Sequence, residues 1–471
     1  MTSPEYPMKR PRSLTAPAVG LAVVVGNLLP LVGIAVWGWN LTALLALYWF
    51  ETVVTTVLTG GKLLFAERAS TQASARLQPL SELTAKRGGF RVRADWPPVY
   101  VRNVPFAVGV LGVSGVVLVV YGLVLALWLS VDPTAVVSAG FVASALGLVV
   151  ARLAEFRADY LGREEYRDVS ARMLAATPAR QLLLLLCLVP VASSGAGGRA
   201  LLVAVVAAKL LSDGYGFLVE HTAHSPGRLG EWLLGPRDTA EPPPTVDAPD
   251  VEPDVRVDTD TRAVLLGGTA PVAAGLASRP GYLAGFVFVL GWFVFGTPVV
   301  VAAGLALCLI AGVKLGAHYL RVGTLQYQRR GDHLVAYDRL LDEPQWATPV
   351  RRLRDVDVEN RVADRLLGTG TLTLSAVESG GRSAVQLGPV ADLDRAVDRL
   401  GLPAVDTSRP ETDRRIVAVA AALGGCFLAV PLGLYALPSV SQGQALGVTL
   451  LLGPFFLLLV GILVASGLSR I

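Results

Sequence analysis

Long stretches without any charged side chain constrain this chain more than any other feature of its sequence. No Asp, Glu, Lys or Arg occurs over residues 13–50, 281–313 or 416–469. A helix needs about 20 apolar residues to cross a hydrocarbon core about 30 Å thick. Because 53% of the 471 residues are apolar and 17% are charged, against about 25% charged in soluble domains, we predict a membrane protein.

The lengths of the apolar runs, and the turns between them, predict about ten crossings. Six precede residue 236, two lie between 281 and 320, and two lie between 416 and 469. Residues 263–278 form either a further span or an interfacial helix. The first run lacks a small-residue cleavage site, so we expect it to be retained as a span. The six early spans are placed at 16–36, 41–59, 104–129, 135–151, 181–196 and 200–218.

The distribution of positive charge predicts the orientation. The loop over 60–103 holds eight basic residues against three acidic ones, whereas the short loops at 130–134 and 194–198 hold almost no positive charge. Positive charge in short loops marks the cytoplasmic side. We therefore expect a plasma-membrane protein with both termini, the 60–103 loop and a polar segment at 321–409 in the cytoplasm.

Residues 236–262 are rich in proline and acidic side chains and poor in large apolar ones. Such a composition cannot bury enough apolar surface to repay the entropy of ordering. We predict a disordered linker between a six-span domain (1–235) and the later parts of the chain. These parts are a two-span hairpin (263–320), the polar domain (321–409) and a C-terminal two-span hairpin (410–471).

The polar segment shows the pattern of a small α+β domain. Short runs with β-branched or aromatic residues predict strands, and apolar residues spaced three and four apart over 390–400 predict a closing helix. The sequence carries a strand motif P-x-x-x-L-x-x-V, where the family has "P-x-x-x-I-x-x-V", and an "LLG-x-G-T" turn. These motifs are formed by Pro349, Leu353, Val356, Leu366, Leu367, Gly368, Gly370 and Thr371. Over about residues 281–403 the chain resembles the bacterial membrane pleckstrin-homology-like family, which implies an antiparallel meander closed by one helix.

The charges of this domain are balanced. Residues 321–403 carry twelve Arg and twelve acidic residues, and the only dense basic cluster is Arg351, Arg352 and Arg354. This cluster is either a contact for a lipid headgroup or a protein partner, or a solvated strand edge.

Two segments of the N-terminal half contain sequence features that are shared with a known family. Phe156, Tyr160, Gly162, Glu165 and Tyr166 precede a P-x-R pair at 178–180, and a K-x-x-x-D pattern at 209–213 precedes an E-H pair at 220–221. These features resemble an uncharacterised six-span family of haloarchaeal and other prokaryotic membrane proteins, which implies architecture and no chemistry. The use of 36 Arg beside five Lys is typical of a high-GC genome, and the acidic linker is typical of a halophile. With the resemblance, these two features predict an archaeal source.

A charged stripe on the predicted sixth span is the main candidate site. Lys209 and Asp213 lie four residues apart, hence on one helix face, and are expected to pair. Glu220 and His224 extend the stripe, and Glu51 adds a carboxylate from the second span. Ionisable groups inside a membrane are costly unless they are paired. The stripe is therefore either an ion, proton or substrate path or a structural ion pair.

Catalytic motifs are absent from the sequence. It contains no G-x-S-x-G, P-loop or Rossmann pattern, and EHTAH at 220–224 is not the H-E-x-x-H of zinc proteases. We expect no metal, cofactor or nucleic-acid partner. Our leading hypothesis is a non-enzymatic protein that organises the membrane or docks a partner. The alternative is an ion, proton or small-solute transporter or channel that uses the stripe.

Overall fold

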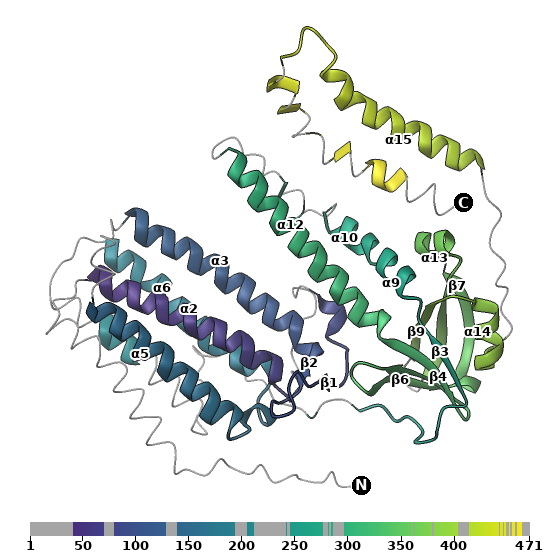
Figure 1. Cartoon of the computed structure of the whole chain (residues 1–471), viewed down its shortest axis with the longest axis horizontal. Helices are drawn as coiled ribbons and strands as arrows, with labels where there is room; N and C mark the ends of the chain where they lie inside the picture. Colours follow the sequence, from purple (N-terminus) through teal and green to yellow (C-terminus); the bar gives the residue numbers. More distant parts are fainter. Residues whose placement is uncertain are drawn as a thin grey trace. The chain divides into compact units, whose positions relative to one another are not determined.

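The computed structural model divides the chain into two compact units (Figure 1). The first comprises Met1–Thr84 and Arg91–Pro244, and the second comprises Ala85–Phe90 and Thr245–Ile471. The structure describes residues 41–69, 80–128, 139–193, 205–211, 245–276, 296–359, 361–378, 381–403 and 414–441, with residues 242, 281, 284 and 285 and scattered residues between 443 and 463.

The first unit contains a bundle of long apolar helices. These are α2 (Leu41–Phe65), α3 (Val104–Trp128), α5 (Ala139–Glu155) and α6 (Ala171–Ser193). Helix α2 packs against the other three (Figure 1). Its Leu44, Leu45 and Tyr48 are buried in a core with side chains of α3 and α6. Many valines and leucines of α3 point outward, as expected for a helix that faces lipid.

Short elements close the polar ends of these helices. They are η2 (Ser81–Leu83), β2 (Val99–Tyr100), η3 (Val101–Asn103), the π-helix η4 (Phe156–Leu161) and η5 (Glu165–Arg167). The Nδ2 of Asn103 donates to the carbonyl of Ala66 at 2.7 Å, and the hydroxyl of Tyr160 donates to the carbonyl of Lys62 at 2.6 Å. These bonds satisfy carbonyls that the end of α2 leaves unpaired.

The structure confirms a membrane protein with a helical bundle. Five helices within the described residues are long and apolar enough to span a bilayer, at Ala43–Phe65, Val101–Leu127, Ala139–Leu161, Ala171–Leu188 and Val301–Gly323. Helix α15 (Arg414–Leu434) contains a shorter apolar stretch. The span predicted at 16–36 and most of that at 200–218 lie outside the described residues. The count of ten therefore stays a prediction.

The second unit contains two antiparallel sheets. One has the order β3 (Val255–Asp258), β4 (Leu325–Arg330), β5 (His333–Asp338) and β6 (Glu343–Pro349). The other has the order β7 (Leu353–Glu359), β8 (Gly370–Glu378) and β9 (Gly381–Val390). Helix α13 (Val362–Leu367) connects β7 to β8, and α14 (Leu393–Leu400) follows β9. The predicted meander closed by one helix is confirmed.

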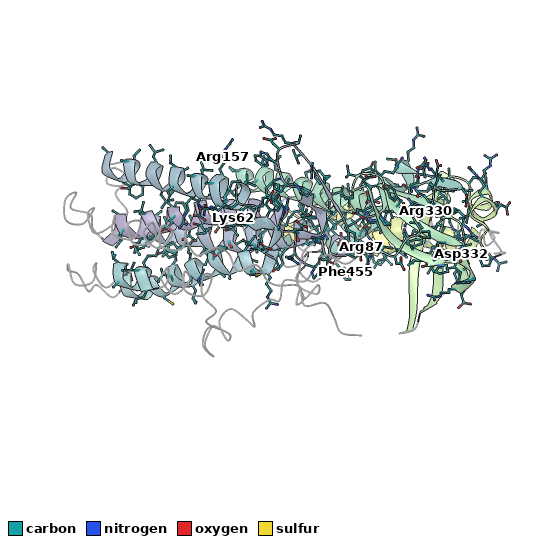
Figure 2. The ribbon with its side chains drawn as sticks, turned by 90° about the horizontal axis from the view of Figure 1, so that it is seen from below. Lys62, Arg87, Arg157, Arg330, Asp332 and Phe455 are labelled. Atoms are coloured by element: carbon teal, nitrogen blue, oxygen red, sulfur yellow. The ribbon has the colours of Figure 1, made fainter. Side chains whose placement is uncertain are left out.

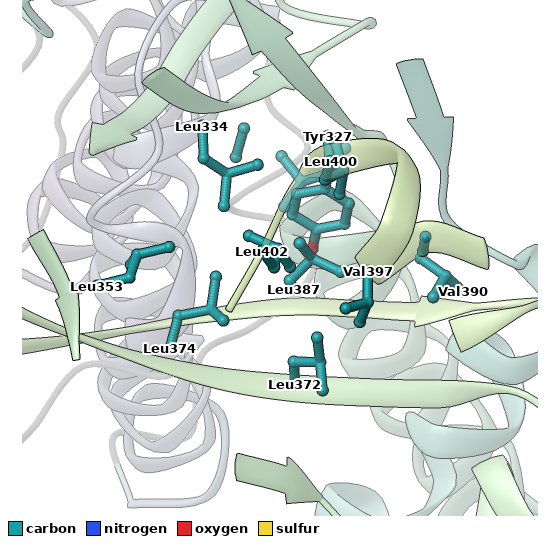
Figure 3. Close-up of a cluster of buried hydrophobic side chains, with 13 residues drawn as sticks. Tyr327, Leu334, Leu353, Leu372, Leu374, Leu387, Val390, Val397, Leu400 and Leu402 are labelled. Atoms are coloured by element: carbon teal, nitrogen blue, oxygen red, sulfur yellow. The ribbon is translucent and has the colours of Figure 1, made fainter. Parts of the chain in front are cut away.

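One hydrophobic core joins the two sheets and α14 (Figure 3). Alternate residues of β8, Leu372 and Leu374, are fully buried, because successive side chains of a strand point to opposite faces. From α14, Val397 and Leu400 enter the same core. The apolar residues whose spacing predicted this helix therefore form its buried face.

Strand β3 corrects the predicted linker. Residues 236–262 were expected to be disordered throughout, and this prediction is wrong over Val255–Asp258. The alternation of Val255 and Val257 with Arg256 and Asp258 places both valines against the core, and β3 pairs with β4 along its whole length. Four residues of strand pattern inside an acidic segment are thus enough to complete the sheet.

Three α-helices with described bounds lie between β3 and β4 in the chain. They are α9 (Thr261–Gly267), α10 (Thr269–Leu276) and α12 (Thr297–His318), and the π-helix η6 (Tyr319–Gly323) joins α12 to β4. Helices α9 and α10 have seven and eight residues, and at 1.5 Å per residue neither is long enough to cross a bilayer. The choice between a further span and an interfacial helix for residues 263–278 stays open, because residues 277–280 lie outside the described part of the chain.

Candidate functional site

A buried ion pair in the second unit joins two distant parts of the chain. The Nζ of Lys86 donates to the Oδ2 of Asp338, and the side chains are 5% and 0% exposed. Lys86 belongs to the 60–103 loop, whereas Asp338 is the last residue of β5. We refer to residues 85–90 together with Thr324 and Asp338 as the clasp.

The surroundings of Asp338 satisfy both of its oxygens. The Oδ1 accepts from the backbone amides of Leu340 at 2.9 Å and Leu341 at 3.1 Å. The hydroxyl oxygen of Thr324 lies 2.7 Å from Oδ2 and 3.4 Å from the Nζ of Lys86. Because a buried charge is tolerated only when it is paired and hydrogen-bonded, this geometry fixes the lysine to one position.

The residues after Lys86 lie along β6. The backbone amide of Arg87 donates to Gln345 Oε1 at 2.9 Å, and Gln345 Nε2 donates back to the carbonyl of Arg87 at 3.0 Å. Gly88 has a φ of +80°, and a Cβ atom there would lie 2.7 Å from Glu343. Glycine is therefore required both by the left-handed backbone and by the close approach. The short strand β1 (Gly89–Phe90) ends the segment.

Burial lowers the pKa of Lys86, and the charge and hydrogen bond of Asp338 oppose this effect without cancelling it. Desolvation disfavours the ammonium form, while a nearby carboxylate favours it. The clasp thus combines a costly buried charge with an ion pair that compensates for it in part.

A second cluster of charges lies in the helical bundle of the first unit. The carboxylate of Glu51 on α2 accepts from Lys209 at 3.2 Å and from Arg152 at 3.0 Å. Arg152 also binds Glu155 at 3.0 Å, and Glu155 binds Lys62 at 3.0 Å. Figure 2 shows Lys62 among these helices. We call these five residues the charge ladder.

The signs in the charge ladder alternate from cation to carboxylate. Three cations and two carboxylates leave one formal positive charge, and each carboxylate lies between two cations. Lys209 and Lys62 also lie over the rings of Tyr48 at 5.7 Å and Tyr160 at 5.4 Å. Glu51 and Lys62 are eleven residues apart on α2, so the ladder extends about 16 Å along a helix in a core about 30 Å thick.

The structure brings together part of the predicted stripe. Glu51 and Lys209 are in contact. Asp213, Glu220 and His224 lie outside the described residues, so the expected pairing of Lys209 with Asp213 stays a prediction.

The sequence interpretation missed Lys62, Arg152 and Glu155. Two signals indicate them. Lys62 follows Glu51 by three helical turns, and Arg152 and Glu155 are three residues apart, so each pair occupies one helix face.

The predicted arginine cluster is exposed where it is described. Arg351 and Arg352 lie on η7 (Val350–Arg352) and point into solvent. The side chain of Arg351 is 78% exposed, and its Nε lies 4.0 Å from the Oδ2 of Asp332. Arg354 belongs to β7, but its side chain lies outside the described part. The exposure agrees with either interpretation of the cluster.

The described residues contain no group of three or more His, Cys, Asp or Glu side chains placed to hold a metal ion. The chemistry available in the clasp and in the charge ladder is that of ion pairs and hydrogen bonds. Both sites fix the positions of chain segments.

Comparisons with known families agree with this architecture. The model of a family of unknown function (DUF6498) matches residues 8–228, and the model of a bacterial PH domain matches residues 285–418. Both resemblances drawn from the sequence are confirmed. No curated protein and no solved structure matches the chain. The residues that match the first family include the four long apolar helices of the first unit, and those that match the second include β4 to β9 and α14.

Proposed function

We propose that this chain is a non-enzymatic membrane protein that organises the membrane surface or docks a partner through its pleckstrin-homology-like domain. The observation that carries the proposal is the clasp. Thr324 lies at the junction of η6 and β4, so Lys86 and Asp338 hold the sheet at the point where the α12 helix ends. Because the domain is fixed at the end of the candidate span Val301–Gly323, it can present a docking surface in a constant position.

The clasp also supports the proposed topology. Lys86 lies in the basic 60–103 loop, and Asp338 lies in the pleckstrin-homology-like domain. Two residues that form a buried ion pair must lie on the same side of the bilayer. The charge of the 60–103 loop favours the cytoplasm, so we assign the domain and both termini to the cytoplasmic face of the plasma membrane.

The proposed docking contact is the exposed pair Arg351 and Arg352. We would cross-link the full-length protein in native membranes and compare Arg351→Glu/Arg352→Glu with the control Arg395→Glu/Arg399→Glu, which reverses two exposed charges on α14. We expect at least a tenfold loss of the cross-linked protein or lipid in the first variant and less than a twofold loss in the control. Equal recovery from both variants would contradict this docking contact.

The second candidate function is a transporter or channel, and the length of the charge ladder favours it. Titratable groups along a membrane-spanning helix are typical of ion and proton paths. Pairing of every charge in the ladder favours a structural role instead. Reconstituted protein separates the two: a saturable ion or proton flux that Glu51→Gln abolishes would make the bundle a transporter, and the docking role predicts no such flux.

A further inference from the structure

A cavity of about 570 Å³ lies at one end of the three-stranded sheet. Its lining comes from the end of β7, from α13 and the turn into β8, and from the start of α14. The volume falls in the range of small-molecule sites, about 300 to 1,000 Å³. Neither the clasp nor the arginine cluster contributes to it.

The cavity is acidic. Glu359, Asp364, Asp392 and Asp394 line it together with one cation, Arg365, so the formal sum of these charges is −3. Two of the carboxylates are held in place. Glu359 binds Arg361 at 2.6 Å, and Asp392 accepts from the backbone amide of Arg395 at 3.0 Å at the start of α14.

Asp364 supplies an independent observation. Its side chain lines the cavity although the residue is only 4% exposed. The Oδ1 accepts from Thr369 at 2.6 Å, whereas the buried Oδ2 has no hydrogen-bond partner among the described residues. Buried carboxylate oxygens in folded proteins are almost always hydrogen-bonded. The second oxygen therefore lacks a donor that a ligand can provide.

We propose that this cavity binds an organic cation through a guanidinium or primary ammonium group, which donates to Asp364 Oδ2. An N–H donor satisfies the unpaired oxygen, and its positive charge offsets the acidic lining. The described residues provide no cluster suited to a metal ion, which favours an organic ligand. The proposal goes beyond the docking contact at Arg351 and Arg352, because neither residue lines the cavity. Both a free polyamine and a basic side chain of a protein carry this chemistry.

Binding to the purified full-length protein tests the proposal. The probes are spermidine, for a free polyamine, and Nα-acetylarginine amide, for a side chain, with potassium chloride at matched ionic strength as the reference. We expect saturable binding of at least one organic probe. Asp364→Asn should weaken it at least tenfold, and Asp398→Asn, an exposed α14 residue outside the cavity, should change it less than twofold.

Each outcome decides the proposal. Saturation by spermidine alone indicates a free polyamine, and saturation by the arginine derivative alone indicates a protein side chain; both support an organic-cation site. An equal response to potassium chloride, no saturation by either probe, or unchanged affinity in Asp364→Asn would overturn it. If Asp364→Asn does not fold, Asp394→Lys decides, because it reverses a charge at the exposed rim: a tenfold loss supports the site, and unchanged affinity refutes it.

Discussion

The ammonium group of Lys86 and the carboxylate of Asp338 form a buried ion pair across 252 residues of sequence. One partner lies in the loop before α3, and the other lies at the end of β5. The pair binds a segment of the N-terminal half of the chain into the pleckstrin-homology-like unit.

Replacing Lys86 with Met should destabilise this unit by about 3 to 5 kcal/mol, because Asp338 would be left as an uncompensated buried charge. Hydrogen exchange of the β5 and β6 amides in the full-length protein measures the effect. Asp338→Asn added to Lys86→Met should recover part of the loss. The control is Arg93→Met, which breaks an ion pair with Asp95 whose side chains are 70% and 62% exposed and should cost less than about 1 kcal/mol.

Breaking the charge ladder at Glu51 should destabilise the helical bundle. In Glu51→Gln, both Lys209 and Arg152 lose the carboxylate that they share, while Arg152 keeps its ion pair with Glu155. Two cations of the bundle then lose a compensating negative charge. Thermal unfolding in detergent should show a lower midpoint. Adding Lys209→Gln should restore part of the stability, since it removes one of the two cations that lost the carboxylate of Glu51. Additive losses in the double variant would show that the two side chains are not coupled.

The neighbouring glycines Gly60 and Gly61 should respond differently to substitution. A Cβ at Gly60 would lie 2.8 Å from Leu111 of α3, whereas a Cβ at Gly61 meets nothing within 4 Å. Gly60→Leu should therefore cost about 1 to 3 kcal/mol through overpacking between α2 and α3. Gly61→Leu is the matched control, and an equal loss of thermal stability in both variants would refute the close packing.

Acid should weaken the pleckstrin-homology-like unit in part through Glu359. Burial raises the pKa of its carboxyl group, but hydrogen bonds from Thr373, Arg361 and Gln386 together with the charge of Arg361 lower it further, so the net shift is downward. A carboxyl group with a lowered folded pKa stabilises the protein above its unfolded pKa, near 4.5. This stability is lost as the pH falls through the folded value. Melting curves of Glu359→Gln should show a smaller dependence on pH below 4.5.

Tags in the 60–103 loop and in the 321–403 domain should be reached by reagents from the same side of the membrane. The clasp requires this, and the positive charge of the loop predicts the cytoplasmic side. Labelling of single-cysteine variants in inside-out vesicles measures it. Opposite accessibility of the two positions would exclude the clasp in the membrane.

Local periodicity explains why the domain could be predicted. Strands β4 to β9 and helix α14 follow apolar patterns that repeat every two residues or every three to four. Strand β3 escaped prediction because Val255–Asp258 lies in an acidic, proline-rich stretch and its partner β4 lies far along the chain. The pattern of four residues carried too little information to outweigh that composition.

The ion pairs were predictable only in part. Glu51 and Lys209 stand out because charge is rare inside apolar runs. The partner of Lys86 could not be found, since nothing local links it to Asp338. One signal was present: in a chain with five lysines beside 36 arginines, three of the lysines lie in the clasp and the charge ladder. The ammonium group of lysine is a compact point charge, whereas the guanidinium group of arginine is a planar fork, so the two are not interchangeable at a buried position. A rare lysine in an arginine-rich chain therefore marks such a position.

The separation of the clasp residues has a consequence for biogenesis. Ribosomes build the chain from its N-terminus, so Lys86 is synthesised 252 residues before Asp338. At about 5 to 20 residues per second, this interval lasts about 13 to 50 s. Throughout it Lys86 lacks its partner Asp338, while the intervening candidate spans are synthesised. Closure of the clasp is therefore a late event of maturation, and a nascent chain that stalls before β5 leaves the 60–103 loop unattached.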